Sequence, residues 1–212
     1  MRTIFEQRYA GLRPYLYHLT DRSNLARIRE TNTILPVARL MELAGRADLL
    51  RIRRRGHEWL NIGQESILTR DQAPLHEGNV ELINGFSFED LVESINRRSF
   101  FWPGTAAGPI SYGVRHFQRY QKEHPVVLQI AFQSLLNMNR GVDPLYCKYN
   151  SGSPRCSGGN KSPRGPDTFL PAARFNGAPS KVVEVTFGVP IVLPADARVG
   201  NRPAGPWRLL RQ

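Results

Sequence analysis

The sequence SGSPRCSGGNKSPRGPDTFLPAAR at residues 151–174 leads, after a short link, into SKVVEVTF at residues 180–187. The first stretch is rich in glycine and proline and almost without apolar residues before Phe169, which predicts a long loop. The second stretch alternates like a strand and carries one acid, Glu184, among apolar neighbours. A cationic loop beside a lone carboxylate suggests a substrate-binding loop next to a catalytic acid. A solvated insertion and an outward-facing glutamate are the alternatives.

The segments on both sides of this loop have the patterns of short strands and short helices. SFFW at residues 99–102 is typical of a buried strand, stopped by Pro103-Gly104, and the apolar run at 125–132 is the strongest strand pattern. Further strands are expected at residues 15–19, 59–62, 66–69, 146–149 and 190–193. Helices are expected at residues 23–30 with Ser23 as the cap, 36–54, 86–97 with Ser87 as the cap and Asp90 at the third position, 110–123 and 134–139. Because the strands concentrate late in the chain, the pattern predicts an α+β domain.

The length of 212 residues and the apolar content of 41% predict one domain with a substantial core. We expect this domain to cover residues 1–197, followed at 198–212 by a basic tail that contains proline and glycine and is loosely ordered. No segment approaches the roughly 18 uninterrupted apolar residues of a membrane span, and the first residues lack the apolar region of a secretory signal. The sequence therefore predicts a cytoplasmic protein without a membrane partner.

Positive charge dominates the composition, with 29 Lys and Arg against 18 Asp and Glu and a formal net charge of +11. Such an excess favours a polyanionic partner, such as a nucleic acid or a phosphate-rich cofactor. Arg155, Lys161 and Arg164 lie among glycines in the long loop, where close approach of the backbone suits phosphate binding. His76 beside Glu77 offers either an acid–base pair for the substrate or an ordinary turn.

The two cysteines, Cys147 and Cys156, lie around the start of the loop. They are too few for a disulfide scaffold and form no metal motif, so no metal site is expected. In a cytoplasmic protein we expect two free thiols rather than a bridge. No histidine pattern nearby points to a nucleophilic cysteine.

The segment YHLTDRSNLARI, residues 17–28, resembles the first motif of ADP-ribosyltransferases of the DarT kind, which attach ADP-ribose from NAD to DNA bases. In that group a strand that ends in Tyr-His-apolar-Thr leads to Asn-Leu at the start of a helix. The motifs PLHEGN, FFWPG, YGVRHF and YNSGSPR are similar to those of an uncharacterised bacterial domain family, which indicates no activity. The first resemblance implies an ADP-ribosyltransferase-like fold, a mixed and antiparallel split sheet with short flanking helices.

The resemblance also implies a role for each residue of the site. His18 would hydrogen-bond the ribose hydroxyls of NAD, while Thr20 and Asn24 would help orient its nicotinamide half. Tyr112 would stack on the nicotinamide ring. Glu184 would be the catalytic acid, because breaking the nicotinamide–ribose bond develops positive charge that a carboxylate stabilises. Without the resemblance, His18 has the pattern of a core histidine and Tyr112 of a side chain that packs on its own helix.

One departure from the family pattern concerns the pyrophosphate of NAD. DarT-type enzymes carry an arginine just after the strand that has the sequence SFFW here, and this chain has Pro103-Gly104 instead. Either Arg115 supplies that charge, with Arg70 as a second candidate, or the NAD is held differently.

These features predict a NAD-dependent mono-ADP-ribosyltransferase that uses NAD as a substrate and modifies a base of DNA or RNA. A toxin or anti-phage role, with an antitoxin or hydrolase partner, follows from the resemblance alone. The alternatives are a transferase that acts on protein side chains, and a non-catalytic basic module that binds nucleic acid on the same fold. An RNA 2′-phosphotransferase would also use this general fold. A metal-dependent nuclease is disfavoured because the sequence has no cluster of Asp, Glu and His ligands.

Overall fold

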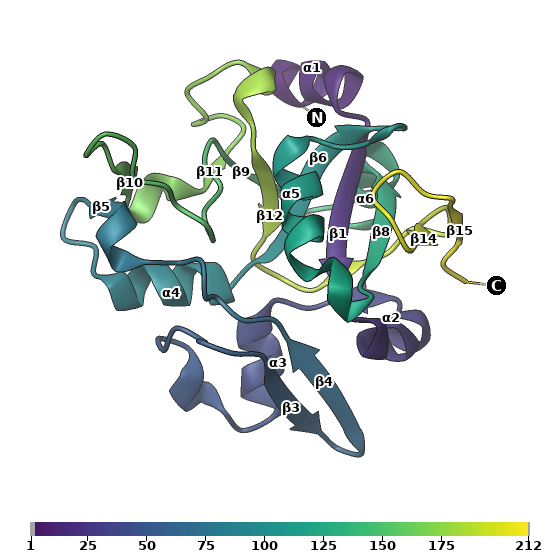
Figure 1. Ribbon diagram of the computed structural model, residues 1–212. Helices are drawn as coiled ribbons and strands as arrows, with labels where there is room; N and C mark the ends of the chain where they lie inside the picture. The colour runs from purple at the N-terminus through teal and green to yellow at the C-terminus, as the bar shows by residue number, and fades with distance from the viewer. Residues whose placement is uncertain (1–2, 212) are drawn as a thin grey trace.

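The apolar run predicted as the strongest strand lies near the middle of the main sheet. The computed structural model describes residues 3–211 (Figure 1). The strands follow the order β11 (Leu170–Pro171), β9 (Leu145–Cys147), β12 (Glu184–Phe187), β6 (Ser99–Thr105), β1 (Tyr15–Thr20), β8 (Val126–Ala131), β14 (Arg198–Gly200) and β15 (Arg208–Leu209), with β7 (Gly108–Pro109) beside β6. All of these pairings are antiparallel.

Helices cover both faces of this sheet, which confirms the α+β class (Figure 1). Leu16 and Tyr17 are neighbours on β1 and point to opposite faces, into two different core clusters. The cluster around Leu16 is closed by α1 (Ile4–Leu12), α2 (Leu25–Thr31) and α6 (Phe132–Met138). On the other face, α5 (Ser111–Tyr120) packs beside Tyr17, and α4 (Phe88–Asn96) packs against β9. The helix α1 was not predicted from the sequence.

The strand predicted to stop at Pro103-Gly104 continues through both residues, so this expectation is wrong. β6 extends to Thr105 and the chain then returns as β7. A side chain at Gly104 would place its Cβ 2.3 Å from the carbonyl oxygen of Gly108. The glycine therefore permits a close return of the backbone rather than ending the strand.

One predicted helix cap is wrong and one is confirmed. Asp21, rather than Ser23, caps the turn before α2, because its carboxylate accepts a hydrogen bond from the backbone N–H of Ser23 at 2.9 Å. Ser87 and Asp90 form the predicted reciprocal capping box at the start of α4.

The helix predicted over residues 36–54 is much shorter than expected. It forms only α3 (Val37–Leu43), and Gly45 follows with a left-handed φ of 68°. A short 3-10 turn at Ala47–Leu49 comes next, and the chain then turns before β3 (Glu58–Ile62). The arginines at residues 51–55 consequently lie in the irregular segment between α3 and β3, and they do not form a helix end.

Within residues 3–211, three small two-stranded sheets complete the fold. β3 pairs with β4 (Glu65–Thr69) as the predicted hairpin. β13 (Ile191–Val192) pairs with β2 (Thr33–Ile34). β10 (Ser162–Arg164), inside the long loop, pairs in parallel with β5 (Val80–Leu82). Because the loop also contributes β11 to the main sheet, it is a folded part of the protein and not a solvated insertion.

The tail at residues 198–211 is well ordered, so the expectation of loose order is wrong. β14 pairs with β8, and β15 pairs with β14. Val199 and Leu210 are each only 1% exposed and belong to the core under α2 and α6. The burial of these apolar side chains stabilises the tail on the sheet.

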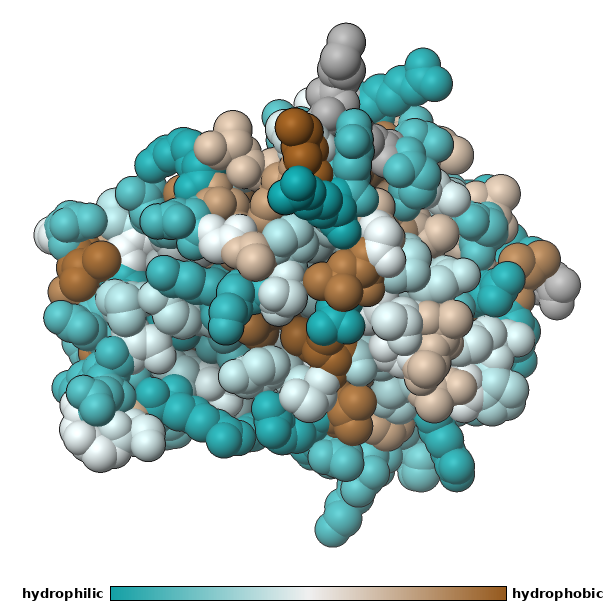
Figure 2. Space-filling view, turned by 90° about the horizontal axis from the view of Figure 1, so that it is seen from above, coloured by the Kyte–Doolittle hydropathy of each residue, from teal (hydrophilic) through white to brown (hydrophobic). Residues whose placement is uncertain are grey.

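The surface is largely hydrophilic on the face shown in Figure 2, where apolar residues form separate patches. The exposed large apolar side chains include Ile52 and Trp59. Among the helices at residues 3–211, none is both long and apolar enough to cross a membrane.

Candidate functional site

The two central strands β1 and β6 form a fork. Their pairing extends from Tyr15–Gly104 to Tyr17–Trp102. Beyond this point β1 continues beside β8 as far as Thr20, while the first residues of β6 pair with β12. The two strands therefore diverge, because each follows its other neighbour in the sheet.

A cavity of about 310 Å³ opens at this fork, lined by both arms, by α5, by β4 and by the start of the long loop. His18 and Thr20 line it from β1, and Ser99, Phe100 and Trp102 line it from β6. Its lining includes seven of the site residues predicted from the sequence: His18, Thr20, Asn24, Tyr112, Arg115, Arg155 and Glu184.

Glu184 is the buried acid of the cavity, with 2% of its surface exposed. Ser151 holds both of its oxygens: the backbone N–H donates to Oε1 at 3.0 Å, and the hydroxyl donates to Oε2 at 2.6 Å. Burial raises the pKa of Glu184 to about 7, although the two hydrogen bonds and the charge of Arg164 act in the opposite direction. Near neutral pH this carboxyl group can therefore accept or release a proton.

Two neutral histidines face the same space. Nδ1 of His18 lies 2.9 Å from the carbonyl oxygen of Phe100. Since a carbonyl only accepts, Nδ1 is the donor and Nε2 is left as an acceptor. Burial lowers the pKa of His18, and burial together with the charges of Arg70 and Arg119 lowers the pKa of His116 to about 4. Both imidazoles are uncharged at neutral pH.

Asn24 lines the cavity but uses its amide to hold the β3–β4 hairpin against β1. Its Nδ2 donates to the carbonyl oxygen of Leu68 at 2.8 Å, and its Oδ1 accepts from the N–H of Leu68 at 2.9 Å. The same Nδ2 lies 3.3 Å from Oγ1 of Thr20. These contacts explain why Asn-Leu follows the strand at this spacing: the asparagine positions one wall of the cavity.

Tyr112 and Arg115 lie on α5 next to one another. The guanidinium carbon of Arg115 is 4.8 Å from the centre of the Tyr112 ring. Arg115 is exposed, whereas Tyr112 is partly buried. One face of the Tyr112 ring is therefore covered by a cation, and a ligand ring can stack only on the other face.

The family comparison covers most of the chain, from residue 14 to residue 193. The chain belongs to DUF7002, a family of unknown function. Comparison with curated proteins and with solved structures gives no match.

Three predicted substrate contacts of the DUF7002 protein lie outside the cavity lining. Arg164 is 1% exposed, donates to the backbone carbonyls of Pro163 and Asn150 at 3.0 and 3.2 Å, and so holds the loop together. This placement argues against the predicted phosphate contact. Lys161 is exposed on the loop, and His76 is exposed at the turn before β5.

Sequence reasoning missed two arginines that line the cavity, Arg54 and Arg98. Arg54 is 9% exposed; its Nη1 donates to Oδ1 of Asn96 at 2.7 Å, and its Nε donates to the carbonyl oxygen of Arg70 at 2.9 Å. Burial lowers the pKa of Arg54 to about 10, which leaves it charged at neutral pH. Arg98 also lines the cavity, with its guanidinium carbon 4.4 Å from the centre of the Phe169 ring. A run of arginines in the sequence does not reveal which of them turn inward.

Both thiols of the DUF7002 protein are free, as predicted. Cys147 is buried, and burial raises the pKa of its thiol, so it remains protonated. Within residues 3–211, no three or more His, Cys, Asp and Glu side chains gather in a way that could hold a metal ion.

Proposed function

We propose that this protein is a NAD-dependent mono-ADP-ribosyltransferase that modifies a nucleic-acid base. The observation that carries the proposal is that His18 and Glu184, far apart in the sequence, line one cavity at the fork between β1 and β6. Trp102 and Tyr112 provide flat rings on which a nicotinamide can stack. Arg54, Arg70 and Arg98 line the same cavity and suit phosphate groups. A dinucleotide combines both kinds of group.

The chemistry follows from the state of each side chain. The bond between the nicotinamide nitrogen and ribose C1′ breaks, and nicotinamide leaves with the bonding electron pair as a neutral molecule. The carboxylate of Glu184 stabilises the positive charge that develops on the ribose. The acceptor atom of the base then bonds to C1′ and its proton passes to Glu184, whose pKa of about 7 makes it basic enough to take the proton. Nε2 of His18 accepts a hydrogen bond from a ribose hydroxyl.

A nucleic-acid acceptor is supported by charge. The net charge of +11 raises the affinity for a polyanion. Arg155 lines the cavity at the start of the long loop, and Lys161 is exposed further along the same loop. A strand of DNA or RNA that follows the loop would therefore meet positive charge next to Glu184. A toxin role, neutralised by an antitoxin or a hydrolase, would follow if the acceptor is cellular DNA.

The test is transfer of label from NAD to single-stranded DNA, to RNA and to a protein extract. We expect label on one nucleic-acid acceptor with the wild type and none with Glu184→Gln. The matched control is Glu30→Gln, an exposed acid on α2, which should transfer as the wild type does. Label on protein alone would support the protein-directed alternative. The absence of label on any acceptor, with no binding of NAD in calorimetry, would leave a non-catalytic basic module.

A further inference from the structure

The end of β4 leads into an arginine that keeps two of its three guanidinium nitrogens unused. Nη1 of Arg70 pairs with Oε2 of Glu123 at 3.0 Å, and the centre of the Tyr120 ring lies 4.6 Å from its guanidinium carbon. Nε and Nη2 are buried and have no hydrogen-bond partner within residues 3–211. The side chain is only 13% exposed, so these donors have little access to water. Buried donors without a partner cost free energy, and folded proteins rarely leave them so.

These two nitrogens form the edge with which a guanidinium binds two oxygens of one anion. Arg46 uses the same edge elsewhere in this chain: its Nε and Nη2 donate to the two carboxylate oxygens of Asp48 at 3.1 and 3.2 Å. Arg70 lines the cavity with that edge free. The comparison indicates an oxyanion as the missing partner.

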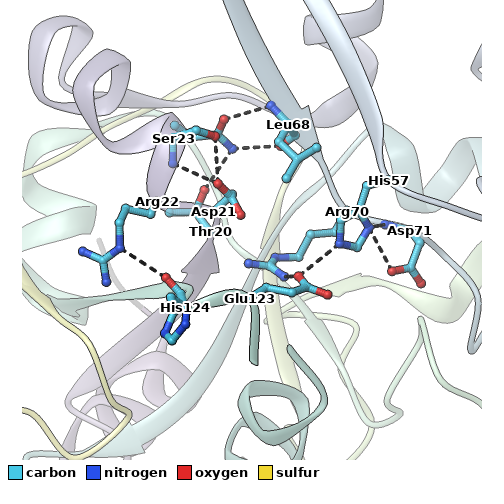
Figure 3. Close-up of polar contacts among 11 residues, drawn as sticks. Thr20, Asp21, Arg22, Ser23, His57, Leu68, Arg70, Asp71, Glu123 and His124 are labelled. Atoms are coloured by element: carbon cyan, nitrogen blue, oxygen red, sulfur yellow. Dashed lines mark hydrogen bonds and ion pairs between the residues drawn. The ribbon is translucent and has the colours of Figure 1, made fainter. Parts of the chain in front are cut away.

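The guanidinium of Arg70 is held in place by a chain of polar contacts (Figure 3). Oε2 of Glu123, which accepts from Arg70, also lies 3.0 Å from Nε2 of His57. Nδ1 of His57 in turn accepts from the backbone N–H of Asp71 at 3.2 Å. Because Glu123 occupies only Nη1, this chain orients the free edge without filling it.

The inner cavity also has more positive charge than its acids neutralise. Arg54 and Arg98 line it, and none of the ion pairs formed within residues 3–211 includes either of them. Within residues 3–211, the lining includes seven arginines and three acids, Asp21, Asp71 and Glu184. Glu184 is hydrogen-bonded by Ser151, and Asp71 is the lining acid whose charge acts on Arg54. Excess positive charge in a partly buried cavity is unfavourable, so an anionic ligand would stabilise this region.

We propose that the free Nε–Nη2 edge of Arg70 is a bidentate site for a phosphate group of a nucleoside diphosphate, with Arg54 and Arg98 supplying further positive charge. The site rests on the proposed function for the identity of the nucleotide, which would be NAD. ADP and inorganic pyrophosphate carry the same diphosphate group, and they test the site without the transfer reaction.

The experiment is calorimetric titration of the whole chain with ADP and with inorganic pyrophosphate. We expect Arg70→Gln to weaken both about tenfold or more, since a hydrogen bond to a charged group contributes more than a neutral one. Arg70→Lys should lose most of the affinity too, because an ammonium group cannot form the bidentate edge. Arg46→Gln is the matched control, because Arg46 lies outside the cavity and Asp48 already occupies its Nε–Nη2 edge. The affinity of this variant for ADP and pyrophosphate should stay within about twofold of the wild type.

Unchanged affinity in a folded Arg70→Gln variant would overturn the site, and so would a wild type that binds neither ligand. If Arg70→Gln unfolds, Arg70→Lys decides in its place. The site and the transferase fail separately. Binding of ADP that depends on Arg70, without transfer of label from NAD, would keep the site and remove the transferase. Transfer of label by Arg70→Gln with an unchanged KM for NAD would keep the transferase and remove the site.

Discussion

Two side chains in the wall of the cavity, Glu184 and Arg70, are buried in opposite ways. Ser151 donates a hydrogen bond to each oxygen of Glu184, so that both oxygens have a partner within the chain. Arg70 is paired through Nη1 alone and leaves Nε and Nη2 without partners. A buried group whose hydrogen bonds are complete is fixed in one orientation, which suits a catalytic role. A buried donor without a partner indicates a position where a ligand can accept a hydrogen bond. Under the proposed function, Glu184 marks a catalytic side of the cavity and Arg70 marks a binding side.

The largest expected effect is on the kinetics of Glu184→Gln and Arg70→Gln, which should differ in whether kcat or KM changes. Glu184→Gln should lower kcat about 100- to 1000-fold with little change in the KM for NAD, because its charge acts on the transition state. Arg70→Gln should instead raise KM about tenfold. Steady-state rates against NAD concentration measure both. If the two variants changed the same parameter, the division into two sides would be wrong.

The second effect is the contribution of Glu184 to the pH dependence of stability. Its pKa of about 7 in the folded protein lies above the ordinary value of 4.5, so the folded state binds the proton more tightly. The contribution of Glu184 to the free energy of unfolding should therefore fall as pH rises from about 4.5 through about 7, by roughly 3 kcal/mol in total. Because the lowered pKa values of His18 and His116 act in the opposite direction, the measurement is the difference between wild type and Glu184→Gln in denaturant unfolding at pH 5 and at pH 8. A difference that is the same at both pH values would contradict the prediction.

The binding side depends on a buried polar network that a single substitution should disrupt. Oδ1 of Asn96 accepts from Arg54 at 2.7 Å and from Gln72 at 3.0 Å, and its Nδ2 donates to the carbonyl oxygen of Leu50 at 2.9 Å. Asn96→Ala leaves these groups buried without partners, and we expect a loss of about 2 kcal/mol in the free energy of unfolding. Chemical denaturation checks it. Asn61→Ala, in the exposed part of the hairpin, is the control and should change stability little.

The smallest effect concerns the hydroxyl of Ser151. Because its hydrogen bond lowers the pKa of Glu184, Ser151→Ala should raise that pKa above about 7. The rise of activity with pH should move to higher pH, with a rate about three- to tenfold lower at pH 7. Ser151→Thr keeps a hydroxyl and should restore the profile, while Ser153→Ala, in the same cavity lining, should leave it unchanged. A lower rate with an unshifted profile would mean that Ser151 only stabilises the loop.

Local patterns in the sequence predicted the local parts of the fold. β8 follows from its apolar run, β1 and the β3–β4 hairpin follow from short strand patterns, and the start of α4 follows from its capping residues. The expectation failed at Pro103-Gly104, because whether a glycine ends a strand or allows a close return depends on which segment packs against it. The tail was misjudged for a similar reason, since Leu210 is buried by contacts with residues far away in the chain.

By itself the sequence determined the positive charge of the protein, its strongest strands and a short motif that contains His18. Only the tertiary structure decided that β1 and β6 diverge, because that divergence depends on the separate pairing of β1 with β8 and of β6 with β12. It also decided that Glu184 meets Ser151 and that Arg70 keeps a free edge. Partners and burial arise between residues distant in the sequence, and local patterns do not encode them.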